Sequence, residues 1–170
     1  MKKILLIGLV ISIYVLISTG LEKTNIIPKD AIRIRILANS NSEYDQKIKM
    51  EVKDSVEPYL NNLLKNTYSM SEAKNIINSN MQNIHNVVDN SLLGRQKYTI
   101  NFGKNYFPQK EYKGVIYEEG YYDSLLVKLG DGLGDNWWCV LFPPLCLLEA
   151  EESDDVEYST YVGELLEKYF

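Results

Sequence analysis

The chain has 170 residues, of which 45% are hydrophobic and 24% are charged, a composition typical of one globular domain. Its 18 basic and 23 acidic residues give a net charge of -5, which argues against a nucleic-acid-binding protein because such proteins need a basic excess. Two cysteines and one histidine are too few for a multi-ligand zinc site or a disulfide-rich scaffold, so we expect no metal and no cofactor.

The first 20 residues have the pattern of a secretory signal. Lys2 and Lys3 precede an uncharged apolar run from Ile4 to Ile17, and small residues follow up to Gly20. We predict cleavage after Gly20; an uncleaved segment would instead anchor the domain in the membrane. Without the two lysines the chain has 16 basic and 23 acidic residues, a net charge of -7. The sequence therefore predicts an acidic domain that is exported across the membrane.

A tether at residues 21–30 is predicted to lead into the folded domain. Residues 31–38 alternate between apolar and charged side chains in their middle, which predicts a strand whose isoleucines lie on a buried face. The other face carries Arg33 and Arg35, and we expect it to be solvated. The alternative is that the two arginines bind a phosphate or a carboxylate.

Two amphipathic helices are predicted after a turn that begins with Asn39 and Ser40. The first is expected from Glu43 to Lys65, where apolar residues recur at helical spacing, with a kink near Pro58 because proline has no amide donor. The second is expected within residues 69–94, because this segment begins with a capping pattern and ends in a glycine. Two such helices in succession are typical of a layer that covers one face of a sheet.

Further apolar runs predict strands at residues 98–102, 112–117 and 125–129. We expect a turn at residues 103–105, and a tight turn or one helical turn at residues 121–124. The order of elements predicts an α+β fold for residues 31–148: a single domain with a mixed or antiparallel sheet covered by two or three helices, preceded by the N-terminal signal or anchor.

The C-terminal part is predicted to contain a loop and a helix. Six acidic residues fall between residues 149 and 157, which predicts a solvated acidic loop over 149–157. Apolar residues then recur at helical spacing over residues 158–170, which predicts a final helix.

Residues 130–146 hold both tryptophans and both cysteines, and the segment does not resemble ordinary scaffold. Its alternating glycines, from Gly130 to Gly134, predict a sharp loop but match neither the P-loop nor the dinucleotide-binding motif. Oxygens of Asp131, Asp135 and Asn136 suit calcium, although the spacing of an EF-hand is absent. The run that follows fits either a core strand or a set of interface anchors, which would be Asn136, Trp137, Trp138, Phe142, Pro143, Pro144 and Leu145.

The two cysteines, Cys139 and Cys146, are predicted to form a disulfide, since the domain is expected to be exported. The alternative is a cysteine nucleophile at Cys139 with His85 as its base. His85 lies in a predicted helix, where an ordinary surface histidine is the more common role. The acidic pair at residues 118–119 lies in a predicted turn and gives no sign of a glycosidase. We therefore expect no catalytic residues.

Two motifs, in this order along the chain, resemble a known family. Residues 32–42 read IRIRILANSNS and lead into a long helix, and residues 136–146 read NWWCVLFPPLC after the glycine loop. Together they resemble the stage II sporulation protein R family of endospore-forming bacteria. The resemblance spans nearly all of the mature chain, and residues 107–108 and 120–121 also fit it. Residues 118–119 depart from the family's usual sequence before the tyrosine.

The resemblance implies a signalling role without catalysis. Family members are made in the forespore and exported across its membrane into the space between forespore and mother cell. There they activate a membrane-embedded aspartyl protease, which processes the pro-form of mother-cell sigma factor E. We thus expect this protease as partner, with no nucleic acid and no small-molecule substrate. Two alternatives stay open: an extracytoplasmic cysteine hydrolase that acts on the cell wall, and a wall-binding module.

Overall fold

The computed structural model describes residues 25–27, 30–112, 115–145 and 155–169. The strands of its central sheet are β2 (Ile32–Leu37), β3 (Tyr98–Phe107), β6 (Gly120–Leu129) and β7 (Asn136–Phe142). They lie in the order β3-β6-β2-β7, and β2 runs parallel to β6 and antiparallel to β7, so the sheet is mixed. A smaller sheet, in the order β1-β5-β4, consists of β1 (Asn25–Ile27), β4 (Lys110–Tyr112) and β5 (Val115–Tyr117).

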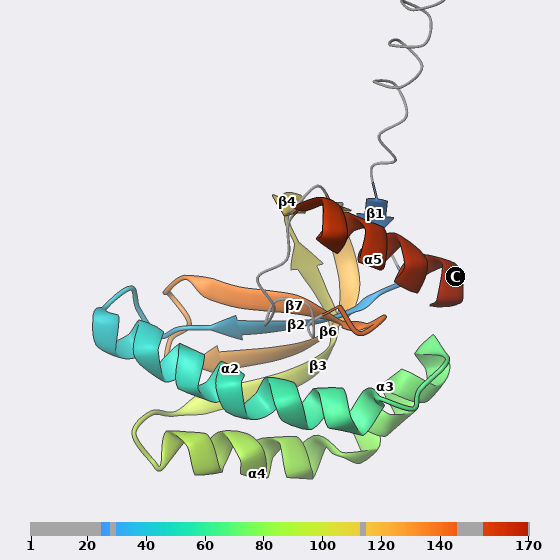
Figure 1. Ribbon diagram of the computed structural model, residues 1–170. Helices are drawn as coiled ribbons and strands as arrows, with labels where there is room; N and C mark the ends of the chain where they lie inside the picture. The colour runs from blue at the N-terminus through green and yellow to red at the C-terminus, as the bar shows by residue number, and fades with distance from the viewer. Residues whose placement is uncertain (1–24, 28–29, 113–114, 146–154, 170) are drawn as a thin grey trace, which may run out of the picture.

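The two sides of the central sheet are covered by different elements. One side is covered by α2 (Glu43–Leu64), α3 (Met70–Ser79) and α4 (Met81–Leu92). The smaller sheet and α5 (Asp155–Tyr169) lie on the other side (Figure 1). The predicted α+β domain with a mixed sheet under helices is therefore confirmed. Within the described ranges, no helix is both long enough and apolar enough to span a membrane. The predicted signal, residues 1–20, lies outside them.

The main core fills the space between the central sheet and the three helices. Ile32, Ile34 and Ile36 of β2 are fully buried there, as their alternation predicts. They meet an apolar stripe of α2 that consists of Ile48, Val52, Val56, Leu60 and Leu64. Burial of these side chains, roughly 1.5–3 kcal/mol each, is the largest stabilising contribution to this face of the sheet.

The opposite face of β2 is not solvated, contrary to the prediction from sequence. Arg33 is fully buried and Arg35 is half-buried. A second core cluster covers this face and contains Val115 and Tyr117 of β5 and Val162 of α5. Strand alternation distinguishes the two faces but does not show whether a second layer covers the polar one.

The first helix follows the prediction closely. Its N-cap is Ser42, whose Oγ accepts a hydrogen bond from the Asp45 amide at 3.2 Å. The helix runs from Glu43 to Leu64 and continues through Pro58, and the kink expected near Pro58 stays a prediction.

The second predicted helix is in fact two helices, α3 and α4, which meet at Asn80. Asn80 leaves the helical conformation, with φ -108° and ψ 11°, and its side-chain amide donates to the Ile76 carbonyl at 2.8 Å. This hydrogen bond satisfies a carbonyl of the last turn of α3. The change of direction lets Ile77 of α3 and Ile84 of α4 both enter the main core. Leu93 then ends α4 with φ 51°, directly before the glycine at which the sequence predicts an end.

Strands β3 and β6 are longer than predicted, and the turns predicted at residues 103–105 and 121–124 are absent. The two strands pair without interruption from Tyr98 opposite Leu129 to Phe107 opposite Gly120. Cross-strand pairing thus overrides the local turn signals, because each extended residue gains ladder hydrogen bonds that the sequence alone does not show. The run predicted at residues 112–117 divides into β4 and β5, which pair antiparallel.

The two ends of the described chain also differ from the sequence prediction. Residues 25–27, within the predicted tether, form β1 and pair parallel with β5. Helix α5 begins at Asp155, so the last three residues of the predicted acidic loop are helical. The rest of that loop lies outside the described residues.

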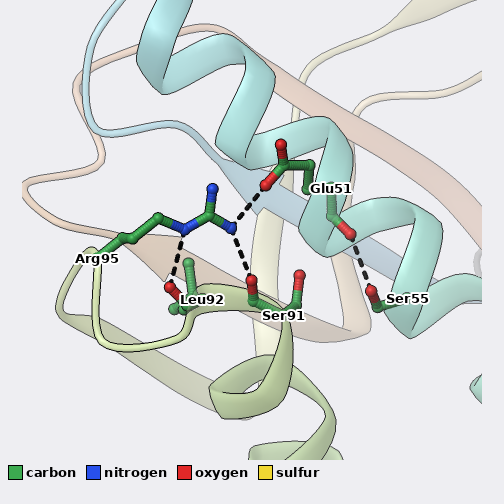
Figure 2. A network of polar contacts seen from close by, with 5 residues as sticks. All are labelled: Glu51, Ser55, Ser91, Leu92 and Arg95. Carbon is green, nitrogen blue, oxygen red and sulfur yellow. Dashed lines mark hydrogen bonds and ion pairs between the residues drawn. The ribbon is translucent and has the colours of Figure 1, made fainter.

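A polar network joins α4 to α2. The Arg95 guanidinium donates to the Leu92 carbonyl at 3.0 Å and to the Ser91 carbonyl at 2.7 Å, and it pairs with Glu51 of α2 at 2.6 Å (Figure 2). Ser55 donates to the carbonyl of Glu51 at 3.0 Å. A cation at a helix C-terminus interacts favourably with the unpaired carbonyls there. The arginine therefore closes α4 and fixes it against α2.

Candidate partner-binding site

The turn after β2 is organised by one buried carboxylate, Asp45, in the first turn of α2. Its Oδ2 accepts hydrogen bonds from Asn39 at 2.9 Å and from Ser40 at 2.6 Å, and its Oδ1 accepts from Gln96 at 2.9 Å. Hydrogen bonds from Ser40 and Asn39, in that order, hold the pKa of Asp45 below its ordinary value. The predicted motif residues Asn39 and Ser40 thus have a structural role in the turn.

The glycine loop between β6 and β7 interlocks with this turn, although the two segments are far apart in the sequence. Backbone amides of the loop donate to the turn: Leu133 to the Asn39 carbonyl at 3.0 Å, and Asp135 to the Asn41 side chain at 2.6 Å. Gly134 donates to the last carbonyl before the turn at 2.9 Å. The turn of the first motif and the glycine loop directly before the second motif therefore form one rigid junction.

Glycine is required in this loop for two different reasons. Gly130 and Gly132 have φ of 53° and 66°, which side-chain-bearing residues rarely adopt. Gly134 has no such strain, but a Cβ on it would overlap the backbone carbonyl of Ser40. The loop can approach the turn this closely only because that Cβ is missing.

Leu133 lies at the tip of the loop with 81% of its surface exposed. Its own amide donates to the turn and that of the next residue to the carbonyl just before the turn, so the backbone beneath this apolar side chain is fixed. A fixed, exposed leucine suits partner binding, because little conformational entropy is lost when it is covered. Leu133 was not among the residues predicted to contact a partner. The signal for it was an apolar residue between loop glycines, outside any helical or strand period.

The adjacent tryptophans of β7 point to opposite faces of the sheet and do not form one patch. Trp137 is half-buried against the main core, with the Lys53 ammonium 5.6 Å from its ring. Trp138 is half-buried in the second core, where its ring lies 5.0 Å from that of Tyr117. Alternation along a strand requires this divergence.

Asn136 is exposed at the start of β7 and contacts the neighbouring strand. With its amide oxygen turned toward Arg35, it accepts two hydrogen bonds from that guanidinium, at 2.7 and 2.9 Å. Arg35 also donates to the Tyr106 carbonyl at 3.5 Å. The arginine is thereby held across the end of β7.

The remaining predicted anchors are mostly core residues. Phe142, Pro143 and Leu145 are buried, and Pro144 is half-buried. The Phe142 ring lies 5.1 Å from that of Tyr169, so it joins β7 to α5. Of the seven predicted anchors, the exposed or half-exposed ones are Asn136, Trp137, Trp138 and Pro144.

Arg33 lies inside a cage of aromatic rings between the central sheet and the smaller sheet. Its Cζ is 3.4 Å from the ring centroid of Tyr122, 5.1 Å from that of Phe107, 5.2 Å from that of Trp138 and 5.8 Å from that of Tyr117. None of its three nitrogens has a hydrogen-bond partner. Burial lowers the pKa of Arg33 to about 10, so the side chain remains charged at neutral pH.

Cys139 and His85 do not form the catalytic pair considered from sequence. Cys139 is buried on the helix-covered face of β7, at one edge of the central sheet. His85 contacts Tyr98 of β3, at the other edge, with 3.2 Å between Nδ1 and the hydroxyl. Three strand spacings separate these edges, about 14 Å. Cys146 lies outside the described residues, so the disulfide stays a prediction.

Acidic residues of the glycine loop belong to the junction described above. Asp135 accepts from the Asn41 amide at 3.5 Å, and the Asp131 amide donates to Asn39 at 2.9 Å. Across the parts of the chain that the structure describes, His, Cys, Asp and Glu residues form no group of three or more that could hold a metal ion.

Comparison with known proteins assigns the chain to a family. The model of the stage II sporulation protein R family matches residues 28–152, and no solved structure matches. Stage II sporulation protein R of Bacillus subtilis (strain 168) is 38% identical over 135 residues, which cover 78% of this chain and 60% of that protein. The chain thus spans about 60% of the length of the curated relative that it matches. With the family model matching more than half of its residues, the chain belongs to the stage II sporulation protein R family.

Proposed function

We propose that this protein is a secreted signal of sporulation that activates a membrane-embedded aspartyl protease. In this proposal the chain is exported from the forespore into the space between the two membranes. The protease then processes the pro-form of mother-cell sigma factor E. Family membership is the observation that carries the proposal. An apolar N-terminal run after two lysines, typical of export, supports the proposed location.

The exposed tip of the glycine loop is the surface proposed to meet the protease. Leu133 is presented on a backbone that the turn holds in place, and Asn136 lies exposed three residues further on. Activation then requires that this surface bind the active form of the protease more tightly than the inactive form, since a ligand shifts an equilibrium only by its differential affinity.

The experiment is co-expression of the chain with the protease and the sigma-factor precursor, scored by precursor cleavage. Full burial of a leucine contributes roughly 1.5–3 kcal/mol, so Leu133→Ser should weaken activation roughly 10- to 100-fold. Tyr68→Ser is the matched control, because Tyr68 is 68% exposed and lies between α2 and α3, outside the loop. That variant should support normal cleavage.

Export and folding are measured in parallel for each variant. Leu133 is exposed, so its replacement should leave the free energy of unfolding within about 0.5 kcal/mol of the original value. Normal cleavage with an exported, folded Leu133→Ser chain would remove the loop tip from the proposed surface. Cleavage that does not depend on the chain at all would refute the proposed function itself.

A further inference from the structure

The environment of Arg33 is unusual for a charged side chain. The residue is fully buried, and all three guanidinium nitrogens lack a hydrogen-bond partner. Buried charges in proteins are normally paired, because removal of an ion from water is costly. None of the ion pairs in the described part of the chain includes Arg33 or its neighbour Arg35.

The four rings around Arg33 compensate only part of this cost. A desolvated cation over an aromatic face is attracted to the ring quadrupole, and Tyr122 at 3.4 Å is close enough for direct stacking. Rings do not, however, accept the guanidinium N–H groups as oxygens do. Two hydroxyl groups nearby are engaged elsewhere: that of Tyr122 donates to the Glu118 carbonyl at 2.7 Å, and Ser124 Oγ accepts from Asn105 at 2.9 Å. Among the described residues, no group accepts a hydrogen bond from the Arg33 guanidinium, so its charge and its donors stay unmatched.

We propose that the aromatic cage around Arg33 is a binding site for a carboxylate group. A guanidinium offers its donors as a planar fork that matches a carboxylate in a two-point contact. Rings packed this closely around the guanidinium must move less to admit a planar group than a tetrahedral one, which favours a carboxylate over a phosphate. The carboxylate would supply both the missing acceptors and the missing counter-charge.

In this proposal the carboxylate reaches the buried guanidinium by local opening of the layer that contains the smaller sheet. Tyr117 of β5 covers the guanidinium on that side and belongs to the second core, together with Val115 of β5 and Val162 of α5. The strands β4 and β5 of this layer are three residues long, and such short strands open locally at a lower free energy than the long strands of the central sheet. Two further cations, Arg35 and Lys110, lie 5.8 Å from the Phe107 ring and 5.4 Å from the Trp138 ring. Their charge attracts an anion to this side of the central sheet.

The test is a binding titration with benzoate, followed by tryptophan fluorescence, because the Trp138 ring is part of the cage. Benzamide, the neutral analogue, and inorganic phosphate serve as the matched probes at equal ionic strength. We expect a saturable change with benzoate, and none with benzamide or phosphate over the same concentrations. Equal responses to benzoate and benzamide, a tighter response to phosphate, or no saturable response to benzoate would overturn the proposal.

Two variants assign the response to Arg33. Arg33→Met removes the charge and should weaken benzoate binding roughly 30-fold or more, as loss of one partner of a buried charge pair does. Its unfolding midpoint should not fall, because it removes an unpaired buried charge. If it fails to fold, Arg33→Lys keeps the charge, loses the fork, and should still bind benzoate measurably more weakly than the original chain. Unchanged affinity in either folded variant would refute the assignment.

The source of the carboxylate is identified by binding measurements with two peptides whose termini are blocked. The peptides are identical except for one position, which is Glu in one and Gln in the other. Binding of the Glu peptide, but not of the Gln peptide, identifies an acidic side chain of a protein partner as the natural occupant. Binding of benzoate alone identifies a small carboxylic acid. Either result supports a carboxylate site. These measurements use no protease, so their outcome is independent of the proposed function.

Discussion

The substitution Gly134→Ala tests whether the glycine loop and the turn after β2 interlock as the structure shows. A Cβ at position 134 would overlap the carbonyl of Ser40 and lie 3.0 Å from the Cβ of Ala38. Both obstacles belong to the end of β2 and the turn, and a backbone carbonyl cannot rotate aside as the end of a long side chain can. The loop must therefore move away from the turn to accept the methyl group.

The cost follows from the contacts that this movement breaks. Two backbone hydrogen bonds join the loop to the turn here, from Gly134 to Ala38 at 2.9 Å and from Leu133 to Asn39 at 3.0 Å. Each contributes about 0.5–1.5 kcal/mol net, and overpacking of a tight contact costs about 1–3 kcal/mol. We therefore expect Gly134→Ala to lower the free energy of unfolding by roughly 2–6 kcal/mol.

The assay is equilibrium unfolding in urea, followed by the fluorescence of the two tryptophans in β7. Gly94→Ala is the control, because Gly94 has φ 75° but a Cβ there would meet nothing within 4 Å. In that variant the free energy of unfolding should fall only by the strain of an alanine in the left-handed conformation, about 1–2 kcal/mol. A smaller loss for Gly134→Ala than for Gly94→Ala would refute the interlocked arrangement.

Three further predictions concern other contacts of the fold. Arg95→Ala should lower the free energy of unfolding in urea by about 0.5–1.5 kcal/mol, because it removes the two carbonyl contacts at the end of α4 and a half-exposed ion pair; no change would show that the network of Figure 2 contributes nothing. Trp138→Ala should lose on the order of 3 kcal/mol in the same assay, because its ring packs in the second core; a loss below about 0.5 kcal/mol would contradict that placement. The pKa of Asp45 is lowered in the fold, so its contribution is present above its ordinary value of 3.8 and lost as pH falls through the folded-state value. In Asp45→Asn, the free energy of unfolding should thus fall less steeply below pH 3.8 than in the original chain. Equal slopes of the two curves at acid pH would argue against the lowered pKa of Asp45.

Local sequence patterns predicted the elements whose bounds are set by interactions between residues close in the sequence. The isoleucines of β2 alternate, and Ser42 caps α2, so periodicity and capping placed both elements to within one or two residues. The break at Asn80 was missed because the apolar period continues across it, and the hydrogen bonds of Asn80 to the preceding turn decide the end of α3.

Features that depend on contacts between distant segments were not predictable. Gly103 lies in the middle of β3 because it is paired with Ser124, and the sequence near the glycine reads as a turn. Arg33 was predicted to be solvated because a charged face of a strand is usually exposed to solvent. The face is buried because β5 and α5, which are distant in the sequence, cover it. In the candidate site, the pattern predicted a sharp glycine loop but not that the loop presents Leu133.

Activation across the membrane is tested most directly by reconstitution of the protease in vesicles, with the sigma-factor precursor present. The purified chain is added to one side of the membrane at a time, and precursor cleavage is measured against its concentration. The proposed function predicts saturable cleavage when the chain is on the extracytoplasmic side of the protease, and none when it is on the other side. Cleavage at the same rate without the chain, or from either side, would contradict it.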